Sequence, residues 1–340
     1  MEDSHVACTA IPVGSQTLDK GHAIFGVFDG HGGDFTSDYA AKNFIKILSA
    51  GSSLKKYSKL KTIDQYDVPG VTLLKTALTE TFCELDDEIR RKQNQRNDRK
   101  GIQSRTIASS RVRQERSGST IVVVLITPSH IICANAGDSR AILQRGGRAL
   151  PLSFDHKPNN IPELERIKAA GGFVKSKRVD GDLAVSRGLG DFSYKSIDGL
   201  PTKDQKVIPQ PEFVIYPRDT QRDEFLILAC DGIWDVATNE ECAKFANGLL
   251  EEGETDLGLI CEEALDTCLD KNSRDNMTFA ILTFDAVNTK RSMTANGAVW
   301  KRRTVRHVRN FEKSAKLVAS KAVAGTGINL HAMTVGVGAR

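Results

Sequence analysis

Short runs of apolar residues, separated by polar turns, recur along most of this chain. Runs of five to eight residues rich in Val, Ile, Leu and Phe are typical of strands that are buried on both faces. They span residues 24–28, 121–127, 225–230 and 277–284. A further run at 130–136 is followed closely by 141–144 and by a Gly-Gly turn, which predicts hairpin-linked β structure.

Apolar residues at spacings of three and four predict amphipathic helices between and after these strands. The predicted helices span 34–49, 71–92, 161–170, 239–250 and 255–269. Strands and helices therefore occur in blocks and do not alternate regularly. This order favours an α+β fold over a doubly wound parallel sheet.

Three segments lack such a pattern. Residues 51–70 are polar and Lys-rich, which predicts a surface insertion, and residues 192–211 are predicted to be irregular. Residues 93–116 contain many arginines and almost no large apolar side chain. This composition predicts a mobile loop, and the alternative is a basic docking patch for a phosphorylated partner.

The composition is that of a globular protein. The chain has 340 residues, of which 40% are hydrophobic, which is enough for one large core. Its seven cysteines are scattered without a CxxC pair, which argues for a reducing compartment. We find no pattern of a signal peptide and no apolar stretch long enough to span a bilayer. We therefore expect a monomer in the cytoplasm, the nucleus or both.

The net charge of +4 hides a strong asymmetry between body and tail. Residues 290–340 carry eleven Lys or Arg and one acidic residue, so the tail is near +10 and the body near −6. Apolar residues recur at steps of three and four from Trp300 to Val318, which predicts a basic amphipathic helix. We expect it to dock on the acidic body, or alternatively to bind a membrane surface or partner or to act as a nuclear signal. Residues 325–340 are predicted to be disordered.

Carboxylates stand at the ends of the predicted strands. Asp29 and Asp231 each follow a buried strand and precede a glycine, and Asp275 lies just before the last strand. Taken singly, each is explained by a plain turn. Three together, with Glu2 and Asp3 before the first strand, predict a cluster that needs a cation to offset its charge. Because the ligands are oxygens, that cation is expected to be Mg²⁺ or Mn²⁺ and not zinc.

The pattern around Asp29 also predicts the reaction. Two ions about 3.5–4 Å apart and bridged by a carboxylate would activate a water molecule to attack a phosphomonoester. Glycines on both sides of His31 let the backbone approach a ligand closely, and the imidazole could protonate the departing oxygen. Other histidines are rivals for this role on composition alone. They are His5, His22 and His156.

Seven motifs stand in order along residues 1–286, and together they resemble the metal-dependent protein serine/threonine phosphatases of the PP2C (PPM) family. They are Met1–Asp3, Phe28–Gly33, Ser117–Thr120, Ala136–Arg140, Asp182–Arg187, Cys230–Asp235 and Arg274–Thr278. The resemblance implies a central antiparallel β-sandwich flanked by pairs of antiparallel helices. It also implies a catalytic domain over 1–286, whose usual first strand is missing, and a basic tail over 287–340.

The resemblance also assigns metal ligands. Asp29 would bridge two ions, and Gly30, through its carbonyl oxygen, and Glu2 would bind one of them. Asp231 and Asp275 would bind the other. A weaker third ion would lie at Asp231 together with two further carboxylates. These are Asp138 and Asp235.

The remaining implied roles concern catalysis and substrate. Asp3 would orient water bound to the ions, His31 would be the general acid, and residues 187–211 would form a flap beside the site. Relatives usually carry a phosphate-binding arginine just before the position of Met1, and neither Arg140 nor Arg187 matches a motif that would replace it. We therefore expect slow turnover, with a phosphoprotein-binding pseudophosphatase as the alternative. A basic nucleic-acid binder is a third hypothesis, which lacks a supporting motif, so no nucleic-acid partner is expected.

Overall fold

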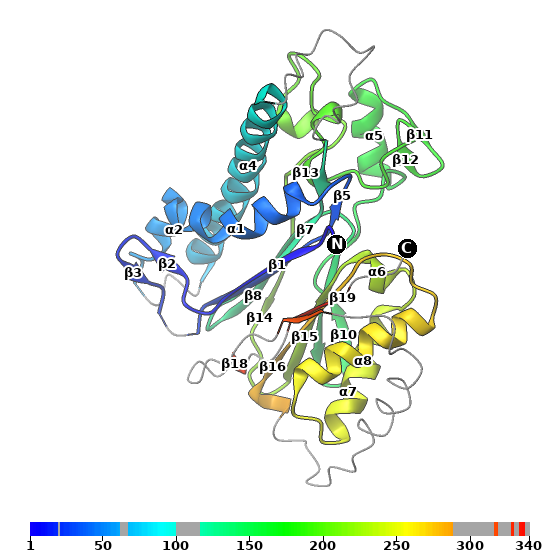
Figure 1. Cartoon of the computed structure of the whole chain (residues 1–340). Coiled ribbons are helices and arrows are strands. Elements are labelled where there is room, and N and C mark those ends of the chain that lie inside the picture. Colours follow the sequence, from blue (N-terminus) through cyan, green and yellow to red (C-terminus); the bar gives the residue numbers. More distant parts are fainter. Residues whose placement is uncertain are drawn as a thin grey trace.

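Two antiparallel sheets form the centre of the computed structural model (Figure 1), which describes residues 1–19, 21–61, 67–99 and 116–287 and the backbone of three short strands near the C-terminus. The first sheet has the strand order β1, β4, β7, β8, β14. Its strands are β1 (Ser4–Cys8), β4 (Ala23–Phe28), β7 (Ile121–Ile126), β8 (His130–Ala136) and β14 (Glu212–Pro217).

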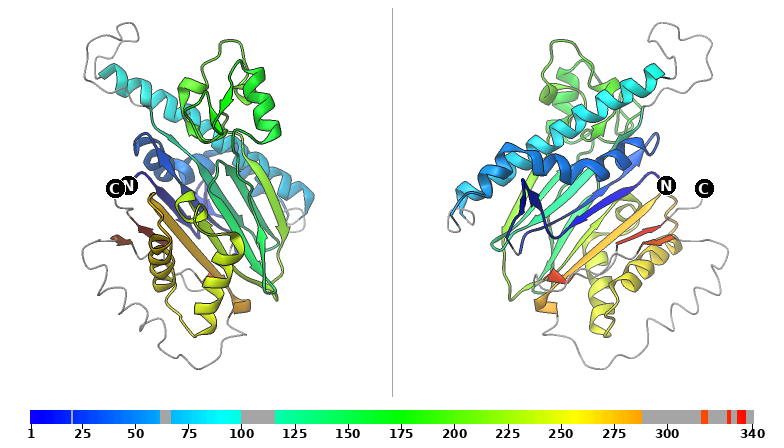
Figure 2. Two further views of the ribbon diagram at one scale, coloured as in Figure 1. Left: turned by 90° about the vertical axis from the view of Figure 1, so that its right-hand side faces the viewer. Right: turned by 60° about the vertical axis from the view of Figure 1, so that its left-hand side comes forward.

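The second sheet packs against the first (Figure 2). Within the described part of the chain, its order is β10, β9, β15, β16, β19, β17, and β18 also pairs with β16. Its strands are β10 (Arg148–Pro151), β9 (Arg140–Arg145), β15 (Asp223–Ala229), β16 (Met277–Phe284), β17 (Lys316–Val318), β18 (Ile328–Asn329) and β19 (Met333–Gly336).

Alternating side chains of each central strand supply two different cores. In β4, Phe25 and Val27 pack between the sheets, whereas Ile24 and Phe28 face the helices that cover the first sheet. All six residues of this strand are buried. Burial on both faces explains why β4 is a continuous apolar run, and it confirms the predicted α+β sandwich.

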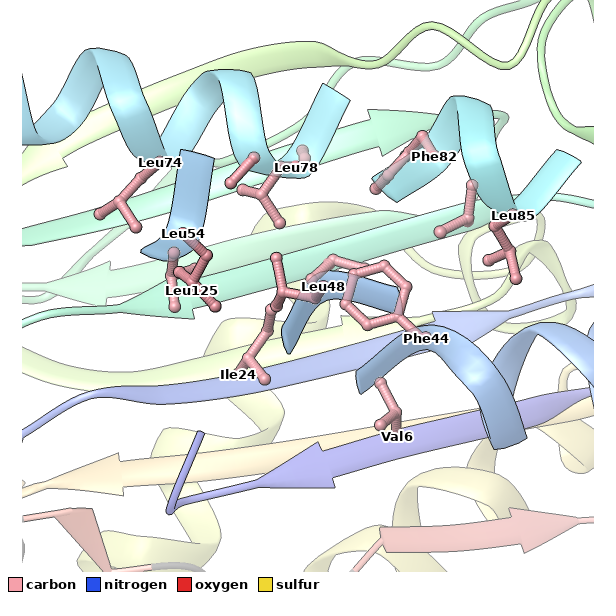
Figure 3. Close-up of a cluster of buried hydrophobic side chains, with 14 of the residues drawn as sticks. Val6, Ile24, Phe44, Leu48, Leu54, Leu74, Leu78, Phe82, Leu85 and Leu125 are labelled. Atoms are coloured by element: carbon pink, nitrogen blue, oxygen red, sulfur yellow. The ribbon is translucent and has the colours of Figure 1, made fainter. Parts of the chain in front are cut away.

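Helices cover the outer faces of both sheets. On the first sheet lie α1 (Phe35–Ala50), α2 (Ser52–Tyr57) and α4 (Val68–Arg99), and on the second lie α7 (Asn239–Glu251) and α8 (Leu257–Asp270). Figure 3 shows Phe44 of α1 and Phe82 of α4 in the core above the first sheet. The short elements complete the fold. They are β2 (Pro12–Val13), β3 (Gln16–Thr17), β5 (Gly30–His31), β6 (Gly118–Ser119), α5 (Ile161–Ala169), β11 (Val174–Lys175), β12 (Arg178–Val179), β13 (Leu189–Gly190), η1 (Phe192–Tyr194), η2 (Thr202–Asp204), α6 (Asp231–Trp234) and η3 (Asp285–Val287).

The surface insertion predicted over 51–70 is wrong in its first part. This part forms helix α2, in which Leu54 and Tyr57 are buried among residues of α1 and α4. Figure 3 shows Leu54 in this core. The Tyr57 hydroxyl lies 2.8 Å from His22 Nε2, so burial of the ring leaves its polar atom bonded. His22 therefore has a structural partner in the core.

The prediction of a loop over 93–116 is wrong for its first residues, 93–99. Helix α4 continues to Arg99, and the side chains of Gln93 and Asn97 are buried. The Gln93 amide donates to the Ser117 carbonyl oxygen at 3.0 Å, which ties the end of the helix to the strand region beside β6. Residues 100–115 lie outside the described residues.

The C-terminal region also differs from expectation where it is described. Strand β17 lies at the end of the segment predicted as an amphipathic helix, and β18 and β19 lie within the segment predicted as disordered. They extend the second sheet next to β16. Most of the predicted helix lies outside the described residues.

Candidate metal centre

Asp29 directly follows strand β4, and hydrogen bonds fix its backbone. Its N–H donates to Thr120 Oγ1 at 3.3 Å, and its carbonyl oxygen accepts from the Thr120 N–H at 2.8 Å. The Thr120 hydroxyl also bonds the Ser139 hydroxyl at 2.8 Å. Thr120 and Ser139 thus support the strand ends and leave the Asp29 carboxylate for another partner.

Three carboxylates meet at this edge of the sandwich. One oxygen each from Asp29, Asp138 and Asp231 lies within 4.8 Å of the other two. Asp29 follows β4, Asp138 follows β8 shortly after its end, and Asp231 follows β15 as the first residue of α6. The ends of strands from both sheets therefore bring these carboxylates together in one cluster, as the strand-end pattern predicted.

The cluster is electrostatically unfavourable without a cation. Burial and the charges of Asp3, Asp231 and Asp138 raise the pKa of Asp29 well above its usual value. Burial, followed by the neighbouring acids, raises the pKa of Asp231 to about 7. Burial also raises the pKa of Asp138 despite its ion pair with Lys157. Divalent cations bound by these oxygens would offset the repulsion.

Asp3 has an unused acceptor at the same place. Its carboxylate is buried, and Oδ2 accepts a hydrogen bond from the Thr278 hydroxyl at 2.8 Å. Oδ1 is buried without a hydrogen-bond partner. Since an orphaned buried oxygen is costly, a cation or its water is a fitting partner, as the predicted role of Asp3 requires.

Glu2 is hydrogen-bonded to Asn276, 274 residues further along the chain. Its N–H donates to Asn276 Oδ1 at 2.6 Å, and its carbonyl oxygen accepts from the Ser37 hydroxyl. These bonds hold the N-terminal segment across the sheet edge, next to Gly30. A β-carbon on Gly30 would lie 2.2 Å from the Glu2 carbonyl oxygen, so only glycine fits there.

Replacing Gly30 with alanine is therefore expected to push the Glu2 backbone away from this sheet edge and to raise the dissociation constant for Mn²⁺ at least about tenfold. Calorimetric titration of the metal-free protein measures this change. Gly248→Ala in helix α7 is the matched control, because a β-carbon there meets nothing within 4 Å. An unchanged affinity in Gly30→Ala would show that Glu2 is not needed for the ions.

The other predicted ligands lie at the rim of the cluster. Asp275 and Asp235 are exposed, and their charges contribute to the raised pKa of Asp231. They do not belong to the three residues whose carboxylate oxygens lie within 4.8 Å of one another. Asp138, which was predicted only for a weaker third ion, does belong to them. The assignment of ligands to particular ions stays a prediction.

Lys157 was not predicted from the sequence as part of this site. Its ammonium group bonds the Asp138 carboxylate and is about one-third exposed. Arg140 and Arg187 have carboxylate partners of their own. Arg140 bonds both oxygens of Asp155, and Arg187 binds Glu163 at 2.6 Å.

His31 lies on β5, one residue beyond Gly30. Its Nε2 lies 2.8 Å from Asp191 Oδ2, and its side chain is 34% exposed. Burial lowers the pKa of His31, but the Asp191 carboxylate outweighs burial, so that the pKa is raised overall. The ring can therefore carry a proton near neutral pH, which suits the predicted acid.

The rival histidines occupy other environments. His5 lies on β1 and burial lowers its pKa. His22 bonds Tyr57, as described above. His156 is buried and accepts a hydrogen bond from the Gly137 N–H through Nδ1 at 3.2 Å. His31 follows Asp29 by two residues, and the charges of Asp138 and Glu2 contribute to its raised pKa.

The raised pKa values predict a dependence of stability on pH. A carboxyl group with a folded pKa above its unfolded value stabilises the fold at low pH, and this contribution is lost as pH rises through the folded pKa. For Asp231 that loss falls between about pH 4 and pH 7. The metal-free Asp231→Asn variant should therefore exceed the unsubstituted chain in melting temperature by roughly 5 °C at pH 8.

Thermal unfolding in EDTA at pH 5.5 and pH 8 measures this difference. The advantage of Asp231→Asn should shrink at pH 5.5, and saturating Mn²⁺ should reverse it at pH 8 because the variant lacks a ligand. An advantage that does not change with pH would contradict the electrostatic account of the cluster.

The sandwich and the carboxylate cluster at its edge define the class of metal-dependent phosphatases. The family model "Protein phosphatase 2C" matches residues 1–277, and the chain belongs to this family. Across the described helices, none is long and apolar enough to cross a membrane.

Similar proteins agree with this assignment. The chain is 39% identical over 284 residues to "Protein phosphatase 1B" of Rattus norvegicus, covering 84% of this chain and 67% of that protein. It is 38% identical to "Protein phosphatase 1A" of Bos taurus over the same shares. Among solved structures, a phosphatase from Toxoplasma gondii has a TM-score of 0.59 at 26% identity, covering 82% of this chain and 92% of the other. A serine-threonine phosphatase 2C from the same organism shares the fold, with a TM-score of 0.63 at 22% identity, covering 82% and 89%.

Proposed function

We propose that this protein phosphatase hydrolyses phosphoserine and phosphothreonine in proteins with two Mg²⁺ or Mn²⁺ ions held around Asp29. The observation that supports the proposal most is the cluster of Asp29, Asp138 and Asp231, with oxygens within 4.8 Å of one another, in which Asp138 is buried and the other two are half-buried. Such a set is costly without cations and has the oxygen chemistry that these ions prefer.

The proposed ligand set is the one that the resemblance to the family implies. Asp29 would hold both ions, the Gly30 carbonyl oxygen and Glu2 would help to hold one, and Asp231 and Asp275 would help to hold the other. Asp138 and Asp235 would hold a weaker third ion together with Asp231. When bound, the ions supply Lewis acidity and lower the pKa of the attacking water.

The chain's own groups have distinct tasks in this reaction. Asp3 accepts a hydrogen bond through its open Oδ1 and orients water at the site. His31 donates a proton to the serine or threonine oxygen as its bond to phosphorus breaks, which prevents release of an unprotonated alkoxide. The products are the free hydroxyl side chain and inorganic phosphate.

Phosphate release from a phosphothreonine peptide tests the proposal. We expect turnover with Mn²⁺ or Mg²⁺ and at least about a 10³-fold loss in excess EDTA, with recovery when the ion is restored. Activity that persists in EDTA would contradict the metal mechanism. Saturable binding of the peptide without turnover would instead identify a pseudophosphatase, and tight, salt-sensitive binding of nucleic acid would favour the third hypothesis.

A further inference from the structure

We propose that Asp191 is a positioning residue for His31, and that their hydrogen bond fixes the imidazole for proton transfer to the leaving oxygen. The proposal rests on the function proposed above and adds a residue that no motif at the metal centre contains. Asp191 Oδ2 lies 2.8 Å from His31 Nε2, although 160 residues separate the two in sequence.

A small three-stranded sheet brings the two side chains together. Strand β6 lies in its middle, with β5 on one side and β13 on the other. The register places both His31 and Gly190 opposite Gly118 of β6. Asp191 follows Gly190 directly, so the backbone pairing alone carries its carboxylate to the imidazole.

Gly118 provides the space in which the pair forms. A β-carbon at this position would lie 2.1 Å from Asp191 Oδ2 and 2.3 Å from His31 Nε2. Any other residue would therefore push the two side chains apart. The contact between His31 and Asp191 therefore explains why residue 118 is a glycine. This supports the view that the fold is arranged to form the pair.

The Asp191 carboxylate bonds the histidine and does not cap the helix that follows it. Asp191 has a φ of 52° and precedes the short helix η1, where an aspartate would usually cap the first turn. Its side chain makes no capping bond. The carboxylate is 5% exposed and bonds the His31 ring instead.

A buried ion pair anchors the segment that carries Asp191. Asp86 of α4 accepts the Gly190 N–H at 2.8 Å and the Lys195 ammonium at 2.7 Å. The same ammonium donates to the Gly188 carbonyl oxygen at 2.8 Å. These bonds hold the residues on both sides of Asp191, so its carboxylate has little freedom to leave the imidazole.

The pairing also assigns the two ring nitrogens. Nε2–H donates to Asp191, so Nδ1–H is the proton available to the leaving oxygen. As the phosphorus–oxygen bond breaks, its electron pair stays on that oxygen, which takes the Nδ1 proton. The neutral ring then regains a proton from water. Asp191 keeps its charge throughout and fixes the orientation of the ring.

Two substrates with different leaving groups test this role. A threonine alkoxide needs protonation, whereas p-nitrophenolate leaves without it. Asp191→Asn should therefore lower kcat on a phosphothreonine peptide about 10- to 100-fold, with KM little changed, and kcat on p-nitrophenyl phosphate less than about threefold. Retained p-nitrophenyl phosphate turnover also shows that the variant is folded.

Asp182→Asn is the matched control, because Asp182 is exposed and accepts its hydrogen bond from the Tyr194 hydroxyl. It should leave both activities unchanged. Asp191→Asn combined with His31→Gln should be no slower on the peptide than His31→Gln alone, since both act through one proton transfer.

Equal loss on both substrates in Asp191→Asn, or additive loss in the double variant, would overturn the proposal. Equal loss on both substrates in His31→Gln would overturn it too, because His31 would then not transfer a proton to the leaving group. The proposed phosphatase function is judged separately, by whether the unsubstituted chain releases phosphate from the peptide in an EDTA-sensitive way.

Discussion

Asp29→Ala is expected to lower kcat on a phosphothreonine peptide by at least about 10³-fold, even at saturating Mn²⁺. The reason is the position of Asp29 in the carboxylate cluster, where it is proposed to hold both ions. Its backbone is bonded to Thr120 in both directions, so removal of the side chain should leave the strand end in place. Steady-state kinetics over a range of Mn²⁺ concentrations measures the loss.

Asp38→Ala is the control for this experiment. Asp38 is half-exposed on helix α1 and pairs with the exposed Lys42, so its removal should change kcat by less than about twofold. The folded state of Asp29→Ala is checked by its melting temperature in EDTA, which should not fall, because the substitution removes a buried negative charge. Near-normal activity of Asp29→Ala would show that the ions act elsewhere.

Lys195→Met is expected to lower the free energy of unfolding by about 3–5 kcal/mol. The Lys195 ammonium is fully buried and binds Asp86 and the Gly188 carbonyl oxygen. The substitution leaves the buried Asp86 without its lysine partner, although the Gly190 N–H still donates to it. Urea unfolding at pH 7 measures the change.

Two further variants show whether the loss of stability in Lys195→Met comes from breaking the buried pair or from losing any lysine. Lys42→Met breaks an exposed pair and should cost less than about 1 kcal/mol. The double variant Asp86→Leu/Lys195→Met should recover most of the loss, since no buried charge remains. A single variant as stable as the unsubstituted chain would show that the pair does not hold the segment that carries Asp191.

The strands were predictable because most central strands are buried on both faces. A strand such as β4 or β16 is then apolar at every position, and its limits follow from the polar residues around it. Helix α2 was not predictable in this way. Its buried apolar side chains, Leu54 and Tyr57, are too few to show a helical period, and the bond that satisfies the Tyr57 hydroxyl comes from the distant His22.

The metal centre was predictable in part from local sequence. Asp29 and Asp231 each follow an apolar run and precede a glycine, and both lie in the cluster. The contribution of Asp138 depends on how β8 meets the second sheet, which local sequence does not encode. The partners Lys157 and Asp191 were missed because each depends on a contact across the fold. For Asp191, the local sequence shows only an aspartate directly after Leu189 and Gly190.

Anomalous diffraction at the manganese edge, from crystals of the full chain soaked in Mn²⁺, tests the central claim most directly. We predict two strong peaks on either side of the Asp29 carboxylate, with Asp231 among the ligands of one and the Gly30 carbonyl oxygen among those of the other. A weaker third peak beside Asp138 would fit the same account. Peaks only at exposed carboxylates, with none at Asp29, would contradict it.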